Sequence, residues 1–182
     1  MKRIIMPALI LLLGGLTITA FTFNKATTPK PVETVTWHTW QEAVELNKKQ
    51  PKKLLVDVYT SWCGWCKVMD KETFTDPKVA EYLNKNYYCV KLDAEMKETI
   101  EFNGHKFEHV ANAGRGGVHT LAYSLLDGQM SYPTIVYLTE KFERVVISPG
   151  YKKPNQLLPE LKFTAEEAFK TKTFEAYMGE TK

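Results

Sequence analysis

The chain has few of the side chains that hold metals or haem. Its 182 residues include three cysteines and four histidines, and no histidine or cysteine spacing near Cys89 completes the four ligands that structural zinc normally takes. Covalent haem attachment needs a histidine directly after the second cysteine of a pair, and Lys67 stands there instead. We therefore expect no metal and no organic cofactor.

The chain also lacks a charge excess, internal repeats and low-complexity tracts. Its 24 basic residues are mixed with 21 acidic ones, and the net charge of +3 indicates no nucleic-acid surface. Glycines 114, 116 and 117 lack the strand and lysine context of a phosphate-binding loop. At 44% hydrophobic residues, the chain can bury a substantial core, but it is too short for two sizeable domains.

What the chain does have is a Cys-x-x-Cys pair directly after an apolar run. Residues 54–59 are typical of a buried strand, and the pair Cys63 and Cys66 follows where a helix is predicted to begin. Unpaired N–H groups and the helix dipole at such a position favour a thiolate. Cys63 is therefore predicted to attack a substrate disulfide, and Cys66 to resolve the mixed disulfide.

Asp57 stands inside this apolar strand. A buried carboxylate costs several kcal/mol unless it is partnered or protonated, and such groups concentrate at catalytic sites. We interpret Asp57 as the base that takes the proton of Cys66, since the resolving thiol is expected to be less exposed and to have a higher pKa. The alternative is a carboxylate at the strand edge that faces water.

These residues resemble the thioredoxin superfamily in three places: Val56-Asp57-Val58, then residues 62–67, then Tyr132-Pro133-Thr134. Residues 66–79 resemble the periplasmic thioredoxin-like domain at the carboxyl end of membrane thiol:disulfide interchange proteins. The resemblance covers roughly Trp37 to Leu161. It implies an α/β thioredoxin fold, with a mixed central sheet flanked by helices.

The resemblance also implies roles for single residues. Cys63 would be the nucleophile, Cys66 the resolving thiol and Asp57 the buried acid, with Lys91 close to that acid. Pro133 would follow a cis peptide bond and face the dithiol, so that the backbone of Tyr132 pairs with a substrate peptide.

The substrate-binding surface is expected to comprise five residues: Trp62, Gly64, Trp65, Tyr132 and Pro133. The chain departs from the family here in two ways. Gly64-Trp65 stands where thioredoxins have Gly-Pro, and Tyr132 stands where a small aliphatic residue is usual. Both positions tune redox potential and substrate choice.

The amino-terminal residues have the layout of a targeting segment. Lys2-Arg3 precede an apolar stretch over residues 4–23, which predicts a signal peptide (1–23) cut after Ala20, or a membrane anchor if it is left uncut. Residues 24–36 are predicted to be a linker. An exported, periplasmic destination suits a dithiol protein, because disulfides form in oxidising compartments.

Residues 37–169 are predicted to form the thioredoxin-like domain, with an insert at about 94–131 before the cis-proline. The insert should hold a hairpin around Asn103-Gly104, a flexible loop over 113–117 and a helix, and form a flap beside the active site. Cys89 is interpreted as a core thiol rather than a third redox centre. We also predict a final helix that runs to Phe169 and, after it, a loosely ordered polar tail over residues 170–182.

We therefore expect an exported, monomeric thiol:disulfide oxidoreductase that reduces disulfides of exported proteins. Its partners would be protein disulfides and a thiol protein that donates or accepts electrons. Three alternatives stay open: a disulfide oxidase or isomerase, a binding module without activity, and a purely structural disulfide between Cys63 and Cys66.

Overall fold

The computed structural model describes residues 34–180. The predicted signal peptide and most of the predicted linker lie outside the described residues. Within residues 34–180, no helix is both long and apolar enough to cross a membrane.

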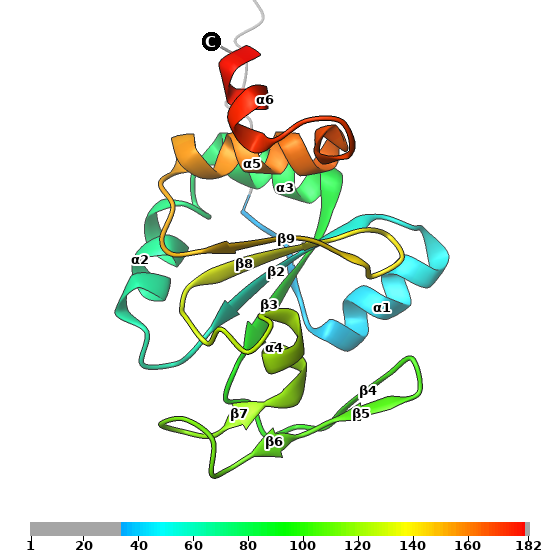
Figure 1. The fold of residues 1–182 in the computed structure, drawn as a ribbon, viewed down its shortest axis with the longest axis vertical. Helices are drawn as coiled ribbons and strands as arrows, with labels where there is room; N and C mark the ends of the chain where they lie inside the picture. The colour runs from blue at the N-terminus through cyan, green and yellow to red at the C-terminus, as the bar shows by residue number, and fades with distance from the viewer. Residues whose placement is uncertain (1–33, 181–182) are drawn as a thin grey trace, which may run out of the picture. The chain divides into compact units, whose positions relative to one another are not determined.

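A five-stranded mixed sheet forms the centre of the domain (Figure 1). In spatial order its strands are β1 (Trp37–His38), β3 (Tyr87–Asp93), β2 (Lys53–Tyr59), β8 (Thr134–Leu138) and β9 (Arg144–Pro149). β1, β3 and β2 pair in parallel, and β8 and β9 extend the sheet at one side through two antiparallel pairings. The central strand β2 is buried along most of its length, as its continuous apolar sequence predicts.

Helices cover both faces of this sheet. The helices are α1 (Trp40–Lys49), α2 (Gly64–Glu72), α3 (Pro77–Asn86), α4 (Thr120–Leu125), α5 (Pro154–Ala165) and α6 (Phe174–Glu180). Helices α3 and α5 lie over one face, and α1 and α4 over the other (Figure 1). Alternate residues of β2 enter the two cores, with Val56 on the α1 side and Leu55 on the α3 side. This arrangement is the predicted thioredoxin fold.

Local sequence signals explain where two of the helices begin. Thr39 and Glu42 form a capping box at the start of α1, with each side chain accepting a backbone hydrogen bond. Asp76 caps α3 by accepting from two backbone N–H groups, and Pro77 occupies the first helical position. Both starts are therefore fixed by neighbouring residues in the sequence.

The insert contains two small antiparallel pairs and α4. The predicted hairpin pairs β4 (Ile100–Phe102) with β5 (His105–Phe107), and Asn103 and Gly104 both have positive φ at its turn. The second pair joins β6 (His109–Val110) to β7 (Val118–His119), and the glycine-rich segment 113–117 is the turn between them.

The prediction for the carboxyl-terminal region is wrong in two respects. The final helix of the sheet layer, α5, ends at Ala165 rather than Phe169. The sequence predicts a loosely ordered tail beyond residue 169, but residues 174–180 form α6. The physical reason is aromatic packing: Phe174 and Tyr177 share one face of α6, and both rings lie within 5.4 Å of the Phe163 ring, centroid to centroid.

Candidate functional site

The two predicted redox cysteines form a disulfide at the start of α2, with 5.3 Å between their Cα atoms. Strand β2 ends at Tyr59, and a turn closed by the Cys63 N–H donating to the Thr60 carbonyl (3.1 Å) leads into the helix. Cys63 is the N-cap residue of α2, and its sulfur accepts a hydrogen bond from the Cys66 N–H at 3.1 Å. A sulfur in this position would be stabilised as a thiolate by the helix terminus.

The disulfide is nearly enclosed, and two indoles beside it are open to solvent. Cys63 and Cys66 are 5% and 2% exposed, whereas Trp62 and Trp65 are 47% and 62% exposed. Gly64 is the first residue of α2, and no atom lies within 4 Å of the position that a Cβ would take there. A partner that approaches the sulfurs therefore meets the two tryptophans first.

Asp57 and Lys91 face each other as register partners on β2 and β3. The Asp57 carboxylate is buried, and its Oδ2 atom lies 2.7 Å from the Lys91 Nζ atom. Burial raises the pKa of the Asp57 carboxyl to about 6, although the Lys91 ammonium opposes the shift. The Oδ1 atom of Asp57 has no hydrogen-bond partner among the described residues. Asp57 is therefore not the water-facing carboxylate of the alternative interpretation.

Lys91 also binds Asp70, a residue that sequence reasoning missed. Burial by itself would lower the pKa of Lys91, but its ion pairs with Asp57 and Asp70 raise it above its ordinary value. The ammonium is enclosed by three rings, at 4.9 to 5.4 Å from the ring centroids of Trp37, Tyr59 and Phe74. Asp70 follows Cys66 by four residues, a helical spacing that could have signalled its place beside the site.

The Tyr132–Pro133 peptide bond is cis, as the resemblance implies. The Pro133 carbonyl accepts a hydrogen bond from the Gly150 N–H at 2.8 Å, which ties this loop to the end of β9. Within residues 34–180, no hydrogen bond involves the backbone N–H or carbonyl of Tyr132. Both groups are free to pair with an extended peptide.

Tyr132 and Pro133 lie close to the two tryptophans that flank the dithiol. The Tyr132 ring packs edge-on against the Trp62 ring, with 5.9 Å between centroids. Trp65 shares a shallow cavity with Tyr132, Pro133 and Tyr151, and its ring lies 5.4 Å from that of Tyr151. The structure thus brings the five predicted substrate-binding residues to one rim around the disulfide.

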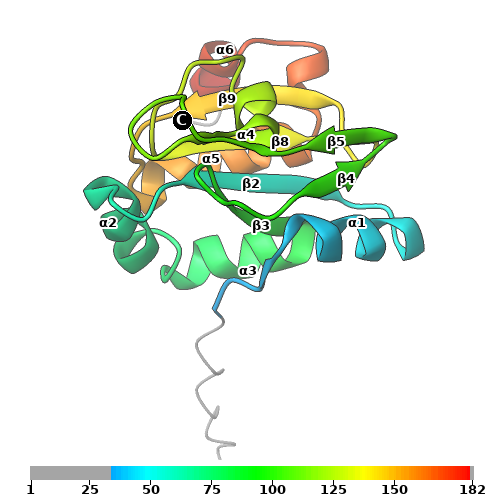
Figure 2. The same ribbon diagram turned by 90° about the horizontal axis from the view of Figure 1, so that it is seen from below.

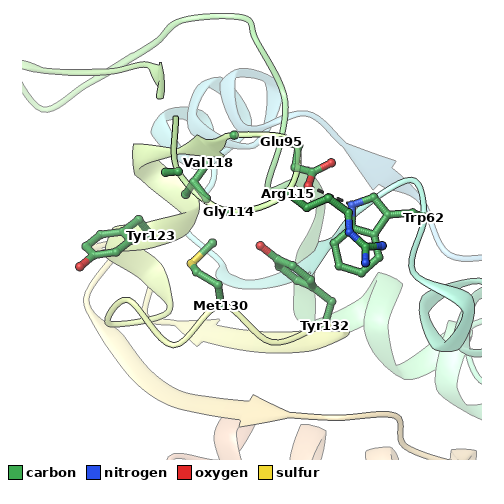
Figure 3. A pocket seen from close by; sticks show the side chains of 10 residues that line it. Trp62, Glu95, Gly114, Arg115, Val118, Tyr123, Met130 and Tyr132 are labelled. Atoms are coloured by element: carbon green, nitrogen blue, oxygen red, sulfur yellow. Dashed lines mark hydrogen bonds between the residues drawn. The ribbon is translucent and has the colours of Figure 1, made fainter. Parts of the chain in front are cut away.

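A second cavity, of about 320 Å³, lies between this rim and the insert (Figure 3). Trp62 and Tyr132 form its active-site wall, and residues of the β6–β7 turn, β7 and α4 form the other walls. The Trp62 indole N–H donates to Glu95 Oε1 at 2.9 Å, and the Arg115 guanidinium lies 5.2 Å from the Trp62 ring centroid. Sequence reasoning missed the cavity residues Glu95, Tyr123 and Met130, and it placed Arg115 only within the predicted loop over 113–117; no local pattern marks any of the four as a cavity residue.

The β4–β5 hairpin is not the part of the insert that contacts the candidate site. Ile100 is fully buried in the core, and the Phe102 ring packs against the Trp40 ring at 5.2 Å. The hairpin tip extends toward α1, on the side away from α2, in both Figure 1 and Figure 2. The contact with Trp62 comes instead from the β6–β7 turn. Of the predicted insert flap, the β6–β7 turn therefore lies beside Trp62, whereas the hairpin does not, because its apolar side chains are used in the core.

The third cysteine and the histidines form no further site in the described part of the chain. Cys89 is a free, buried thiol within the core on the α3 side, as predicted, and burial raises its pKa far above the ordinary value. Among residues 34–180, no group of three or more His, Cys, Asp and Glu side chains is placed to hold a metal ion.

Comparisons with known proteins agree with this geometry. The sequence matches the Thioredox_DsbH family, described as "Protein of unknown function, DUF255", over residues 23–166. Mouse spermatogenesis-associated protein 20 is 32% identical over 83 residues, which are 45% of this chain and 10% of that protein. The thiol:disulfide interchange protein DsbD of Actinobacillus pleuropneumoniae is 28% identical over 124 residues, which are 65% of this chain and 18% of DsbD. The matched region thus spans about a tenth of the length of spermatogenesis-associated protein 20.

Solved structures share the fold. A protein described as DsbH oxidoreductase superposes with a TM-score of 0.54 at 15% identity, over 82% of this chain and 94% of that chain. A thioredoxin-fold protein from Helicobacter pylori gives a TM-score of 0.56 at 17% identity, over 71% and 83%. The chain belongs to the Thioredox_DsbH family, and its thioredoxin fold with a Cys63–Cys66 disulfide supports a thiol–disulfide redox function in general.

Proposed function

We propose that the protein is an exported thiol:disulfide oxidoreductase that reduces disulfides of exported proteins. The observation that carries this proposal is the Cys63–Cys66 disulfide at the amino terminus of α2. A sulfur that caps a helix is held as a reactive thiolate, and a second sulfur one turn later is positioned to release it from a mixed disulfide.

The reaction exchanges one disulfide for another. The Cys63 thiolate attacks one sulfur of the substrate disulfide, so that a Cys63–substrate bond forms and the other substrate sulfur leaves as a thiolate. The Cys66 sulfur then attacks Cys63, which forms the Cys63–Cys66 bond and releases the second substrate thiolate. The substrate gains two electrons, and the protein dithiol loses two. A separate thiol protein must then reduce the protein again.

Asp57 is proposed to accept the Cys66 proton before the second attack. Its buried position supports this role, since the carboxyl has a raised pKa of about 6 and one oxygen free of protein partners. Lys91 is proposed as a positioning residue, because its ammonium binds the other oxygen of the same carboxylate. The pair would hold a base that is ionised at neutral pH and close to protonation.

Substrate binding is proposed at the rim that comprises Trp62, Gly64, Trp65, Tyr132 and Pro133. The free backbone groups of Tyr132 support strand-like pairing with an extended segment of the substrate. The exposed indoles of Trp62 and Trp65 supply apolar contact area around the sulfurs.

Export and the direction of electron flow rest on different observations. The apolar stretch over residues 4–23 supports export, and the resemblance of residues 66–79 to the periplasmic thioredoxin-like domain of thiol:disulfide interchange proteins favours a reducing role. We propose that the protein acts as a monomer on protein disulfides.

A trapping experiment tests the proposal. Cys66→Ser should accumulate a mixed disulfide between Cys63 and a partner protein in the protein's own cells, because the resolving thiol is gone. Cys63→Ser should form no such adduct and should reduce no disulfide, and Cys89→Ser, which removes the core thiol, is the matched control. Adducts are read on non-reducing gels and identified by mass spectrometry. A Cys66→Ser protein that traps nothing would favour a binding module without activity.

A further inference from the structure

We infer that the cavity between Trp62 and the insert is a specificity pocket that receives one large apolar side chain of the substrate, carried by a residue close to the reacting cysteine. This inference rests on the proposed function and adds the class of peptide on which the site acts.

The exposed surface of the cavity is mostly apolar, and its two charged lining residues, Glu95 and Arg115, are both engaged with the Trp62 indole. Met130 lies between Trp62 and Tyr132 on one side and Tyr123 on the other, with Val118 above it in the close view (Figure 3). Tyr132 belongs to this lining as a neutral ring, since a tyrosine hydroxyl is protonated at neutral pH, and burial together with the nearby Glu95 and Asp93 carboxylates raises its pKa further, to about 12. Such a lining favours an aliphatic or aromatic group and disfavours a charge.

The position of the cavity identifies which part of a substrate would enter it. Trp62 directly precedes Cys63, and Tyr132 directly precedes the cis-proline Pro133, so the active-site wall of the cavity is made by the sequence neighbours of the nucleophile and of the cis-proline. Successive residues of an extended peptide are about 3.3 Å apart. A peptide cysteine joined to Cys63 would therefore present a side chain one or two positions away to the cavity.

The wall at Trp62 is already held in place. The indole is fixed by a hydrogen bond to Glu95, by the Arg115 guanidinium over its face and by the Tyr132 ring at its edge. A pre-formed wall avoids the cost of ordering side chains when a ligand binds. The volume of about 320 Å³ is at the small end of ligand pockets, which span roughly 300–1,000 Å³, and suits one side chain rather than a folded element.

The test uses the reduced full chain and a series of disulfide-linked peptides. The peptides differ at one position before or after the cysteine, where Leu, Phe, Ala or Glu is placed, and kcat/KM is measured for the release of peptide thiol. We expect Leu and Phe to exceed Ala by roughly tenfold at one position, as burial of one apolar side chain allows, and Glu to be the slowest. Rates within twofold of one another at every position would overturn the inference.

Two variants localise the effect. Met130→Glu places a charge in the cavity and should reduce the Leu-to-Ala ratio to about one. Tyr123→Ala removes a residue of the cavity wall that is 56% exposed. Because its substitution should be tolerated, this variant tests the inference even if Met130→Glu fails to fold. Val110→Glu is the matched control, because Val110 is an exposed apolar residue of the same insert outside the cavity lining. An unchanged ratio in both cavity variants would overturn the inference.

A small aromatic disulfide such as dithiobis(nitrobenzoate) separates this inference from the proposed function. A wild-type protein that reduces the small disulfide but shows no peptide preference refutes the pocket alone. One that reduces neither kind of disulfide refutes the proposed function, and the pocket assignment with it.

Discussion

The buried sheet residues near the dithiol and the aromatic rim around it differ in exposure and in the kind of contacts they make. In the sheet, Asp57 is buried and bound to Lys91, which is itself enclosed by aromatic rings. At the rim, Trp62 and Trp65 are about half exposed and border apolar cavities. The two regions are therefore expected to affect the reaction in different ways. The buried pair should influence every exchange reaction equally, whereas the rim should influence only the choice of partner.

The largest expected effect comes from Asp57→Asn. If the carboxylate accepts the Cys66 proton, its loss should slow the resolving step at pH 7 by about 100-fold, at the lower end of the range for general bases. The factor should be the same for protein and small disulfides. In wild type the rate should rise with pH around the Asp57 pKa of about 6, and this inflection should vanish in the variant. Single-turnover kinetics from pH 5 to 8 measure both. If the Asp57→Asn variant kept the inflection, Asp57 would not be the group that accepts the Cys66 proton.

The same carboxyl should make stability depend on pH. Its pKa is about 6 in the folded protein against an ordinary value of 3.8, so the folded state binds the proton more tightly. The free energy of unfolding should therefore fall as pH rises from about 4 to about 6, by at most about 3 kcal/mol, and change little from this cause above that range. Urea unfolding of the oxidised protein checks this, with Asp57→Asn as the comparison that flattens the curve. A wild-type curve as flat as that of the variant would contradict the burial argument.

A smaller effect, confined to the rim, is expected for Arg115→Ala. Arg115 covers one face of the Trp62 ring, so its removal should change kcat/KM for a protein disulfide by about two- to fivefold, in line with a cation–π contact of about 0.5–1 kcal/mol. Reduction of a small disulfide should stay the same. Lys106→Ala, on the β4–β5 hairpin, is the matched control. Equal losses of kcat/KM for the protein disulfide and the small disulfide would contradict the expectation that the rim influences only the choice of partner.

Local sequence signals predict much of the fold and the dithiol. The capping box at Thr39, the Asn103-Gly104 turn and the strand before Cys63 each depend on neighbouring residues, and the structure contains all three. The pairing of Asp57 with Lys91 came from family resemblance, since their contact joins separate strands.

The features that the sequence did not predict depend on contacts between distant segments. The cavity walls come from residues spread between 62 and 132, in loops, in β7 and in α4, and only the fold brings these segments together. Helix α6 was not predicted because it is only seven residues long and its apolar residues Phe174 and Tyr177 pack against Phe163, a contact that the local pattern does not show. Asp70 is the exception, because its spacing from Cys66 is visible in the sequence.

The reduction potential of the Cys63–Cys66 pair tests the central claim most directly. The protein would be equilibrated against dithiothreitol or glutathione buffers, with the fluorescence of Trp62 and Trp65 beside the disulfide as the readout. We expect a two-electron transition near the thioredoxin value of about −270 mV, as a reductant requires. A value near −120 mV would contradict the reducing direction, and a pair that does not titrate would contradict thiol–disulfide exchange itself.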